Sequence, residues 1–257
     1  MASASQSFAA TSSPRVVSLD QCADQFVLAL SPRDRIAGLS MRADDADSRL
    51  GALTSGLLKR RVDLETVLAA RPQVVVRYWG GEPGLLDALQ RRDVRIITIA
   101  EARDFKGVRT NIRRVAGSLG RSARGEALIA EMDARLASAR GAWSGRSALY
   151  LTPGGATAGQ RTLVDAILRA AGLSNVEQRA GFQTVSLEAL ALQPPPAVVL
   201  GFFDSAQASG DRFGGGRHQI LQRLVKTRAV ARLPGSMLGC PNWSAAEAVE
   251  LLAAAAP

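Results

Sequence analysis

The longest helical pattern of hydrophobic residues in the chain lies near its middle, between Phe105 and Trp143. Apolar residues recur there at the spacing of three and four that places them on one helix face: Val108, Ile112, Val115, Leu119, Leu128, Ile129, Met132 and Leu136. Gly120 interrupts the pattern, so we expect two helices, the second capped by Ser122 and stopped at Gly141. A helix of twenty residues reaches about 30 Å, which is long enough to bridge two lobes.

Short all-apolar runs alternate with helical patterns on both sides of this stretch. We expect strands over 15–19, 36–39, 74–76, 94–99, 148–151 and 198–200. We expect helices over 22–30, 64–70, 85–92, 162–171, 186–192, 219–225 and 245–255. Strands that are apolar on both faces are typical of parallel sheets covered by helices, so the pattern predicts an α/β protein. We divide it into an N-terminal lobe (15–120), a bridging helix (121–143) and a C-terminal lobe (144–257).

One segment of the first lobe repeats in the second. The two copies begin at Asp63 and Ser186, 123 residues apart, and each reads as a capped helix, a proline, a buried strand and an aromatic loop. Two ordinary αβ units would also give this pattern. Two similar lobes would place the loops Tyr78-Trp79 and Phe202-Phe203 at the carboxyl edges of their sheets, where α/β folds bind ligands.

The composition indicates a globular protein with a basic surface, and it does not identify a ligand. The chain has 257 residues, of which 47% are hydrophobic and 21% charged, so it can bury a substantial core. Its net charge of +9 comes almost wholly from arginines that are scattered along amphipathic patterns. No nucleic-acid motif accompanies them, and we therefore expect a solvated basic surface rather than DNA or RNA binding.

The first fourteen residues are small, polar and patternless, and we expect a disordered lead. They contain no apolar run long enough for a signal peptide or a membrane span. Such a lead fits the remainder of a removed export signal and fits a cytosolic tail equally well.

The two cysteines, Cys22 and Cys240, match no zinc or redox spacing. Both are expected near the boundary between the lobes. In an oxidising compartment they would form a disulfide that clamps the lobes together; otherwise they are two buried thiols.

Several motifs in order resemble one family. They are RVVSLDQCAD at 15–24, the Leu-Glu-x-x-Leu-Ala-x-x-Pro-x-Val-Val pattern at 64–75, the long central helix and VSLE at 185–188. From about Arg15 to the C-terminus the chain resembles the solute-binding proteins of ABC importers for iron-siderophores, haem and vitamin B12. The resemblance implies two Rossmann-like lobes joined by a rigid helix, a ligand in the cleft between them and little hinge closure.

The same resemblance implies a place and partners for the protein. It implies export to the periplasm, or lipid anchoring outside the cell, and a monomer that hands its ligand to an ABC permease with its ATPase. In such proteins an exposed glutamate on each lobe docks on arginines of the permease. Glu82 lies near the first such place, and no clear match stands near the second.

Nine residues are predicted to contact the ligand. The aromatic side chains would supply flat apolar walls, and the arginines would offer paired donors to carboxylates. They are Gln21, Arg42, Arg77, Tyr78, Trp79, Phe202, Phe203, Arg217 and Trp243. Plain surface or core is the alternative for each, and for Trp243 it is packing beneath the last helix. The arginines favour an anionic chelate, and we expect a ferric siderophore or a corrinoid.

Tyr78 has a second interpretation as a ligand of haem iron, because a tyrosine oxygen can hold that metal. His218, the one histidine, is the residue to consider beside it. A haem-binding protein of the same family is therefore an alternative to the siderophore or corrinoid binder.

Catalysis is not expected. The chain has no Gly-x-Ser-x-Gly elbow, no His-rich metal motif and no phosphate loop, and Gly80–Gly84 does not fit the dinucleotide fingerprint. We therefore predict a binding protein without a resident metal or cofactor. An enzyme on a two-lobed α/β scaffold, glycosyl-transferring or chelatase-like, is the alternative from a different class.

Overall fold

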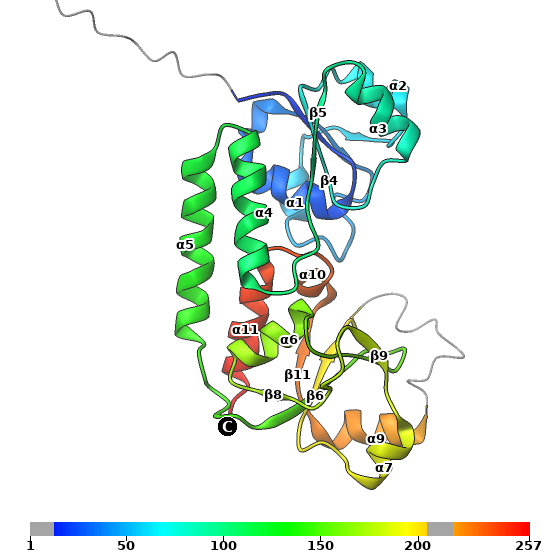
Figure 1. Ribbon diagram of the computed structural model, residues 1–257, viewed down its shortest axis with the longest axis vertical. Coiled ribbons are helices and arrows are strands. Elements are labelled where there is room, and N and C mark those ends of the chain that lie inside the picture. Colours follow the sequence, from blue (N-terminus) through cyan, green and yellow to red (C-terminus); the bar gives the residue numbers. More distant parts are fainter. Residues whose placement is uncertain (1–12, 205–217) are drawn as a thin grey trace, which may run out of the picture.

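The chain forms two α/β lobes at opposite ends of a long helix, as the computed structural model shows (Figure 1). The structure describes residues 13–204 and 218–257. Residues 1–12 of the expected disordered lead, and Arg217, lie outside the described residues. Our proposed boundaries at residues 120 and 143 put each main sheet wholly within one lobe.

The N-terminal lobe is built on a five-stranded parallel sheet in the order β3-β2-β1-β4-β5. Its strands are β1 (Val16–Ser18), β2 (Ile36–Ser40), β3 (Lys59–Arg60), β4 (Val74–Arg77) and β5 (Arg95–Thr98). Its helical elements are α1 (Gln21–Leu30), η1 (Arg33–Arg35), η2 (Gly51–Thr54), α2 (Leu64–Ala69), α3 (Pro83–Gln90) and α4 (Phe105–Ser118). Alternate residues of β4 face opposite layers: Val74 and Val76 pack toward α1 and α4, and Val75 packs toward α2 and α3. This two-sided burial confirms the predicted α/β lobe.

The C-terminal lobe repeats the plan with a four-stranded parallel sheet in the order β11-β10-β6-β8. Its strands are β6 (Ser147–Leu151), β8 (Ser174–Asn175), β10 (Val198–Gly201) and β11 (Ala229–Leu233), beside an antiparallel pair, β7 (Ala156–Ala158) and β9 (Phe182–Thr184). Its helices are α6 (Leu163–Ala170), α7 (Leu187–Leu192), α9 (Gln219–Arg228), α10 (Gly235–Leu238) and α11 (Ser244–Ala254). Strand β11 and the β7–β9 pair were not predicted from the sequence.

The sequence repeat is also a structural repeat. The Asp63 carboxylate accepts the Thr66 N–H at 2.8 Å at the start of α2, and the Ser186 hydroxyl accepts the Ala189 N–H at 3.2 Å at the start of α7. Each helix leads into an interior strand of its sheet, β4 or β10. The aromatic loops after these two strands therefore occupy equivalent positions in the two lobes.

The lobes are joined by α5 (Ser122–Ser138), which runs antiparallel to α4 and packs on α11 (Figure 1). Ion pairs cross both contacts, Arg109 to Asp133 at 2.5 Å and Arg135 to Glu250 at 2.5 Å. The prediction that Ser122 caps this helix is wrong. Ser122 is already helical, because the Arg121 N–H closes the end of α4 on the Ala116 carbonyl and leads straight into α5. In the described parts of the chain, none of the helices is long and apolar enough to cross a bilayer.

A buried carboxyl of α1, that of Asp24, makes the stability of the fold depend on pH. Asp24 accepts hydrogen bonds from the Ser40 N–H at 2.8 Å, from the Ser40 hydroxyl and from the Ser18 hydroxyl, and it is wholly buried. Burial, with a smaller contribution from the charge of Asp20, raises the pKa of Asp24 to about 6. The folded protein therefore holds a proton between about pH 4 and pH 6 that the unfolded chain has already released.

Because unfolding releases that proton, the Asp24 contribution to stability falls as pH rises through this window and levels off above about pH 6. We expect Asp24→Asn to remove this contribution, which amounts to up to about 3 kcal/mol for two pKa units. Denaturant unfolding of both proteins at pH 4 and pH 7 measures it, with Asp87→Asn, an exposed carboxyl on α3, as the control. An unchanged pH dependence in Asp24→Asn would contradict the assignment.

Candidate functional site

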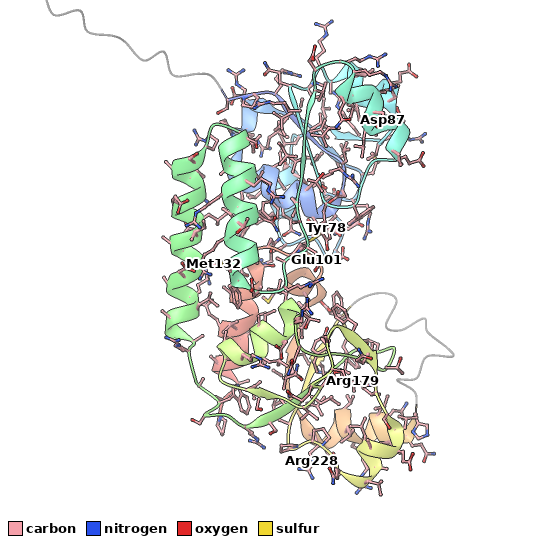
Figure 2. All side chains as sticks on the ribbon, viewed as in Figure 1. Tyr78, Asp87, Glu101, Met132, Arg179 and Arg228 are labelled. Carbon is pink, nitrogen blue, oxygen red and sulfur yellow. A yellow bond between two sulfur atoms is a disulfide. The ribbon has the colours of Figure 1, made fainter. Side chains whose placement is uncertain are left out.

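A cavity of about 420 Å³ lies between the lobes, with walls from both. The first lobe contributes a phenol and two charged groups, and the second lobe contributes loops at the carboxyl end of its sheet and the start of α6. The lining residues are Tyr78, Glu101, Arg103, Arg161, Thr162, Leu163, Val164, Gly181, Phe182, Phe202, Leu238, Gly239 and Pro241. Figure 2 shows Tyr78 and Glu101 together in the region between the lobes.

The position of the cavity follows from the order of the strands. In the first sheet, β1 and β4 are adjacent and parallel, and the chain winds away from them in opposite directions. Open α/β sheets bind ligands in the crevice at the carboxyl ends of such a pair. Asp20 follows β1 and Tyr78 follows β4, so both lie at this switch point.

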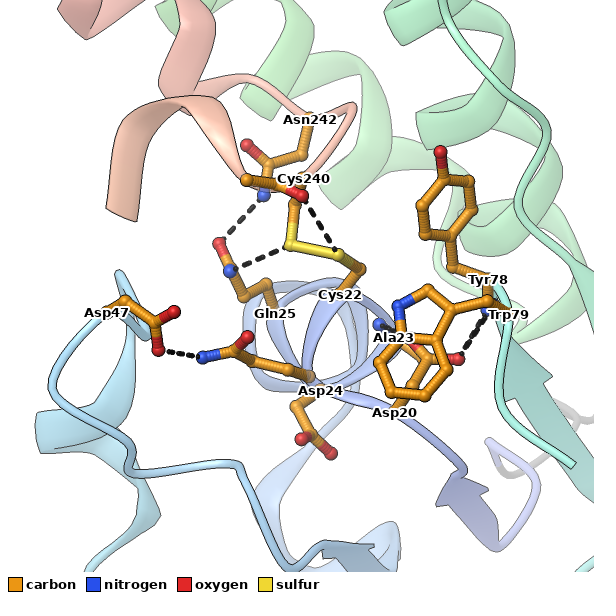
Figure 3. The surroundings of a disulfide bond; sticks show 12 residues. Asp20, Cys22, Ala23, Asp24, Gln25, Asp47, Tyr78, Trp79, Cys240 and Asn242 are labelled. Atoms are coloured by element: carbon orange, nitrogen blue, oxygen red, sulfur yellow. Dashed lines mark hydrogen bonds between the residues drawn. A yellow bond between two sulfur atoms is a disulfide. The ribbon is translucent and has the colours of Figure 1, made fainter. Parts of the chain in front are cut away.

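The loop that carries Tyr78 is held by the carboxylate of Asp20 (Figure 3). One oxygen of this buried group accepts the backbone N–H groups of Tyr78, Trp79 and Gly80, at 2.7, 3.2 and 2.9 Å. Gly80 has to lack a side chain, because a Cβ there would stand 2.2 Å from the Leu19 carbonyl oxygen. The backbone beneath Tyr78 is therefore fixed before any ligand arrives.

The Tyr78 phenol is fixed at its other end by Glu101. Its hydroxyl donates to the Glu101 carboxylate, which lies just after β5. Burial, the hydrogen bond and the nearby charge raise the pKa of Tyr78 above its ordinary value, so the ligand-free phenol keeps its proton. The backbone next to Glu101 is held by buried Asn111, whose amide accepts the Ala100 N–H at 3.0 Å and donates to the Ala100 carbonyl at 2.7 Å.

The facing wall is formed by Phe202, which follows β10. Its φ of +62° is left-handed, a conformation that costs energy for an aromatic residue and is found most often at functional sites. The next turn is held by Asp204, whose carboxylate accepts the Gly235 N–H at 2.9 Å. Phe182, from the β7–β9 pair, adds a second ring that is 67% exposed. The cavity thus has flat apolar surfaces on the side opposite Tyr78.

The two lobes are covalently linked beside the cavity by a disulfide between Cys22 of α1 and Cys240, whose Cα atoms are 5.3 Å apart (Figure 3). The neighbours of Cys240 on both sides, Gly239 and Pro241, line the cavity. Gln25 reinforces the link, because its amide donates to the Cys240 sulfur at 3.4 Å and accepts from Asn242 at 2.7 Å. Of the two states that the sequence left open, the structure contains the disulfide.

Tyr78 and Phe202, two of the predicted ligand residues, line this cavity. Three others share a different surface. Gln21, Arg42 and Trp79 line a separate open groove of about 400 Å³ on the N-terminal lobe, which also includes Glu82. The Arg42 guanidinium is paired there with Asp45 at 2.7 Å.

The structure places three more of the predicted residues away from the lining of this cavity. Phe203 does not line the cavity and packs toward α9, and the guanidinium of Arg232, on β11, lies 5.8 Å from the centre of its ring. Trp243 packs edge-on against Phe26 of α1 at 5.2 Å, a ring partner that lies outside the last helix. Arg77 turns back to donate to the Trp79 carbonyl at 3.1 Å.

Arg217 lies outside the described residues. His218 caps α9 by accepting the Ile220 N–H at 3.3 Å, and it does not line the cavity.

Sequence reasoning missed Glu101, Arg103, Arg161 and Phe182. Glu101, Arg103 and Arg161 lie in loops, where charged residues look like ordinary solvated surface, and Phe182 begins β9, a strand that was not predicted. One signal was available for Glu101. It follows β5, the strand beside β4, and the carboxyl ends of neighbouring parallel strands share one edge of the sheet.

Comparisons with known proteins identify the family and the fold. A family model described as "Periplasmic binding protein" matches residues 16–235. No curated protein sequence matches the chain.

Solved structures share the fold over almost the whole chain. A periplasmic heme-binding protein from Pseudomonas aeruginosa is 25% identical, with a TM-score of 0.69 over 95% of this chain and 92% of the other. The periplasmic heme-binding protein BhuT, in complex with two hemes, is 24% identical, with a TM-score of 0.69 over 95% and 99%. The periplasmic vitamin B12 binding protein BtuF of Vibrio cholerae is 16% identical, with a TM-score of 0.63 over 95% and 97%. The family match spans most of the sequence, and the chain therefore belongs to the periplasmic binding protein family.

Proposed function

We propose that this periplasmic binding protein captures haem in the cavity between its lobes and delivers it to the permease of an ABC importer. The observation that carries the proposal is the Tyr78 phenol, which projects into that cavity from a loop that is held at both ends. A tyrosine oxygen is an established ligand of haem iron. The similarity to a heme-binding protein at 25% identity supports the same cargo.

The aromatic residues and the arginines of the cavity suit the ring and the acidic substituents of a porphyrin. Phe182 and Phe202 offer flat apolar surfaces to a flat macrocycle. Arg103 and Arg161 line the same cavity, and within the described part of the chain neither takes part in an ion pair. Two guanidinium groups without carboxylate partners favour an anionic ligand, such as one that carries propionates.

The setting that we propose is the one that the sequence suggested. The protein would work as an exported monomer, with a permease and its ATPase as partners. A disulfide persists in an oxidising compartment such as the periplasm, which supports this location. Glu82 is exposed at the start of α3 and remains our proposed contact for the permease on the first lobe.

A thermal-shift comparison of haem, cobalamin and ferric siderophores tests the cargo. A ligand present at 100 times its dissociation constant stabilises a protein by about 2.7 kcal/mol, so we expect a clear rise in melting temperature with haem. Phe202→Ala should reduce this rise, whereas Phe203→Ala, which alters the neighbouring ring outside the cavity, should not. A shift with only cobalamin or only a siderophore would replace haem by that ligand, and no shift with any of them would contradict the importer assignment.

A further inference from the structure

We infer that Asp20 is the positioning residue of the site: its carboxylate sets the Tyr78 oxygen where it can bind the iron of the cargo. This inference rests on the proposed function. Asp20 does not line the cavity between the lobes, and its side chain is 1% exposed. It can therefore act on the ligand only through the loop that it holds.

The contacts of Asp20 are concentrated on one short segment. One carboxylate oxygen accepts the Ala23 N–H at 2.9 Å, as a helix cap does. The other accepts three consecutive backbone N–H groups, those of Tyr78, Trp79 and Gly80. A cap needs only the first contact. The three further bonds join the start of α1 to the loop after β4, two segments that are 58 to 60 residues apart.

Among the residues that the structure describes, Asp20 supplies the side-chain acceptor for all three of these loop N–H groups. The last pairing of β4 with its neighbour ends at Arg77, whose carbonyl accepts the Ile99 N–H at 2.7 Å. The next three N–H groups all point at the single Asp20 oxygen, and hydrogen bonds to an ionised carboxylate are stronger than bonds to a neutral acceptor. The absent side chain of Gly80 lets the loop approach closely enough for this.

The consequence for Tyr78 is a ring that is fixed at two points. Its backbone N–H is bound to Asp20 at 2.7 Å and its hydroxyl to Glu101. Without Asp20 the ring would keep the Glu101 bond alone, and the loop beneath it would move.

The test compares ferric haem with metal-free protoporphyrin, because only the iron responds to the placement of Tyr78. In the wild-type protein haem should bind more tightly than the metal-free ring. The Tyr78 phenol would release its proton to solvent as its oxygen binds the iron, and the phenolate-to-iron charge-transfer band should appear. Residues that orient metal ligands typically contribute about 10- to 100-fold to metal affinity, so we expect Asp20→Ala to lower the haem preference by that factor and weaken the band. Asp20→Asn keeps an oxygen for the three loop N–H groups, so it should retain most of the haem preference and most of the charge-transfer band.

Asp63→Ala is the matched control, since Asp63 caps α2 but holds no ligand loop, and it should leave the preference unchanged. Hydrogen exchange on the wild-type protein serves if Asp20→Ala does not fold: the amides of residues 78–80 should be protected although they lie in a loop. An unchanged haem preference in a folded Asp20→Ala protein, or unprotected amides at 78–80, would overturn the role of Asp20. Wild-type protein that does not prefer haem over the metal-free ring would instead overturn the proposed function.

Discussion

Replacing both Cys22 and Cys240 by alanine is expected to lower the free energy of unfolding by about 5 kcal/mol, because the disulfide closes a very long loop in the unfolded chain. The two cysteines are 218 residues apart, and in the chain-entropy description the stabilisation grows with loop length. For a protein of this size, the loss corresponds to a fall in melting temperature of roughly 10–20 °C. Since the bond also joins α1 to the cavity wall at Gly239 and Pro241, the lobes should lose part of their mutual restraint.

Thermal and denaturant unfolding of the double variant and of the wild-type protein, each with and without reductant, measures this effect. Reductant should lower the wild-type midpoint toward that of the variant and leave the variant unchanged. Alkylation followed by intact-mass measurement provides the control on the bond itself. Two labels on the unreduced wild-type protein would show free thiols, and the clamp between the lobes would have to be abandoned.

Tyr78→Phe is expected to weaken haem binding by roughly 100-fold or more, since it removes the hydroxyl oxygen that we propose as the ligand of the iron. The ring itself remains, so the change leaves the apolar packing of Tyr78 in place. The loop should also persist, because its backbone N–H groups stay bound to Asp20. An absorption titration with ferric haem should show the lost affinity together with the loss of the phenolate-to-iron charge-transfer band.

Tyr150→Phe is the matched control for this substitution. Tyr150 is a tyrosine of the same chain whose hydroxyl is buried in the C-terminal lobe and which does not line the cavity. The Tyr150→Phe protein should bind haem with the affinity and spectrum of the wild-type protein. If Tyr78→Phe bound haem with unchanged affinity and spectrum, Tyr78 would be a wall residue and not the iron ligand.

The sequence predicted the fold well because the relevant signals are local. Apolar runs place β1, β4 and β10, and short polar residues such as Asp63 and Ser186 mark the helix starts. The repeat then indicates that the two lobes are similar. Strand β11 follows α9 directly, and its five residues include two exposed positions, so it lacks the uniform apolar run of a central strand.

The site was predictable only in part, for a geometric reason. Successive side chains leave a strand end in opposite directions, so of two adjacent aromatic residues only one faces the cavity. Hydrophobicity cannot tell Tyr78 from Trp79, or Phe202 from Phe203, and in each pair the structure turns the first residue inward.

Other features of the site depend on contacts between distant parts of the chain. Trp243 packs against Phe26 of the first lobe, and no local pattern reveals that partner. The disulfide was undecided for the same reason, because it requires two α carbons far apart in sequence to lie within bonding range.

The position of the iron in bound haem would show whether Tyr78 is its ligand. Anomalous diffraction at the iron edge, from crystals grown with ferric haem, locates the metal without reference to any fitted ligand. We expect one iron in the cavity between the lobes, bonded to the Tyr78 oxygen and facing Phe202. An iron in the Trp79 groove of the N-terminal lobe, or on the outer surface of either lobe, would contradict it.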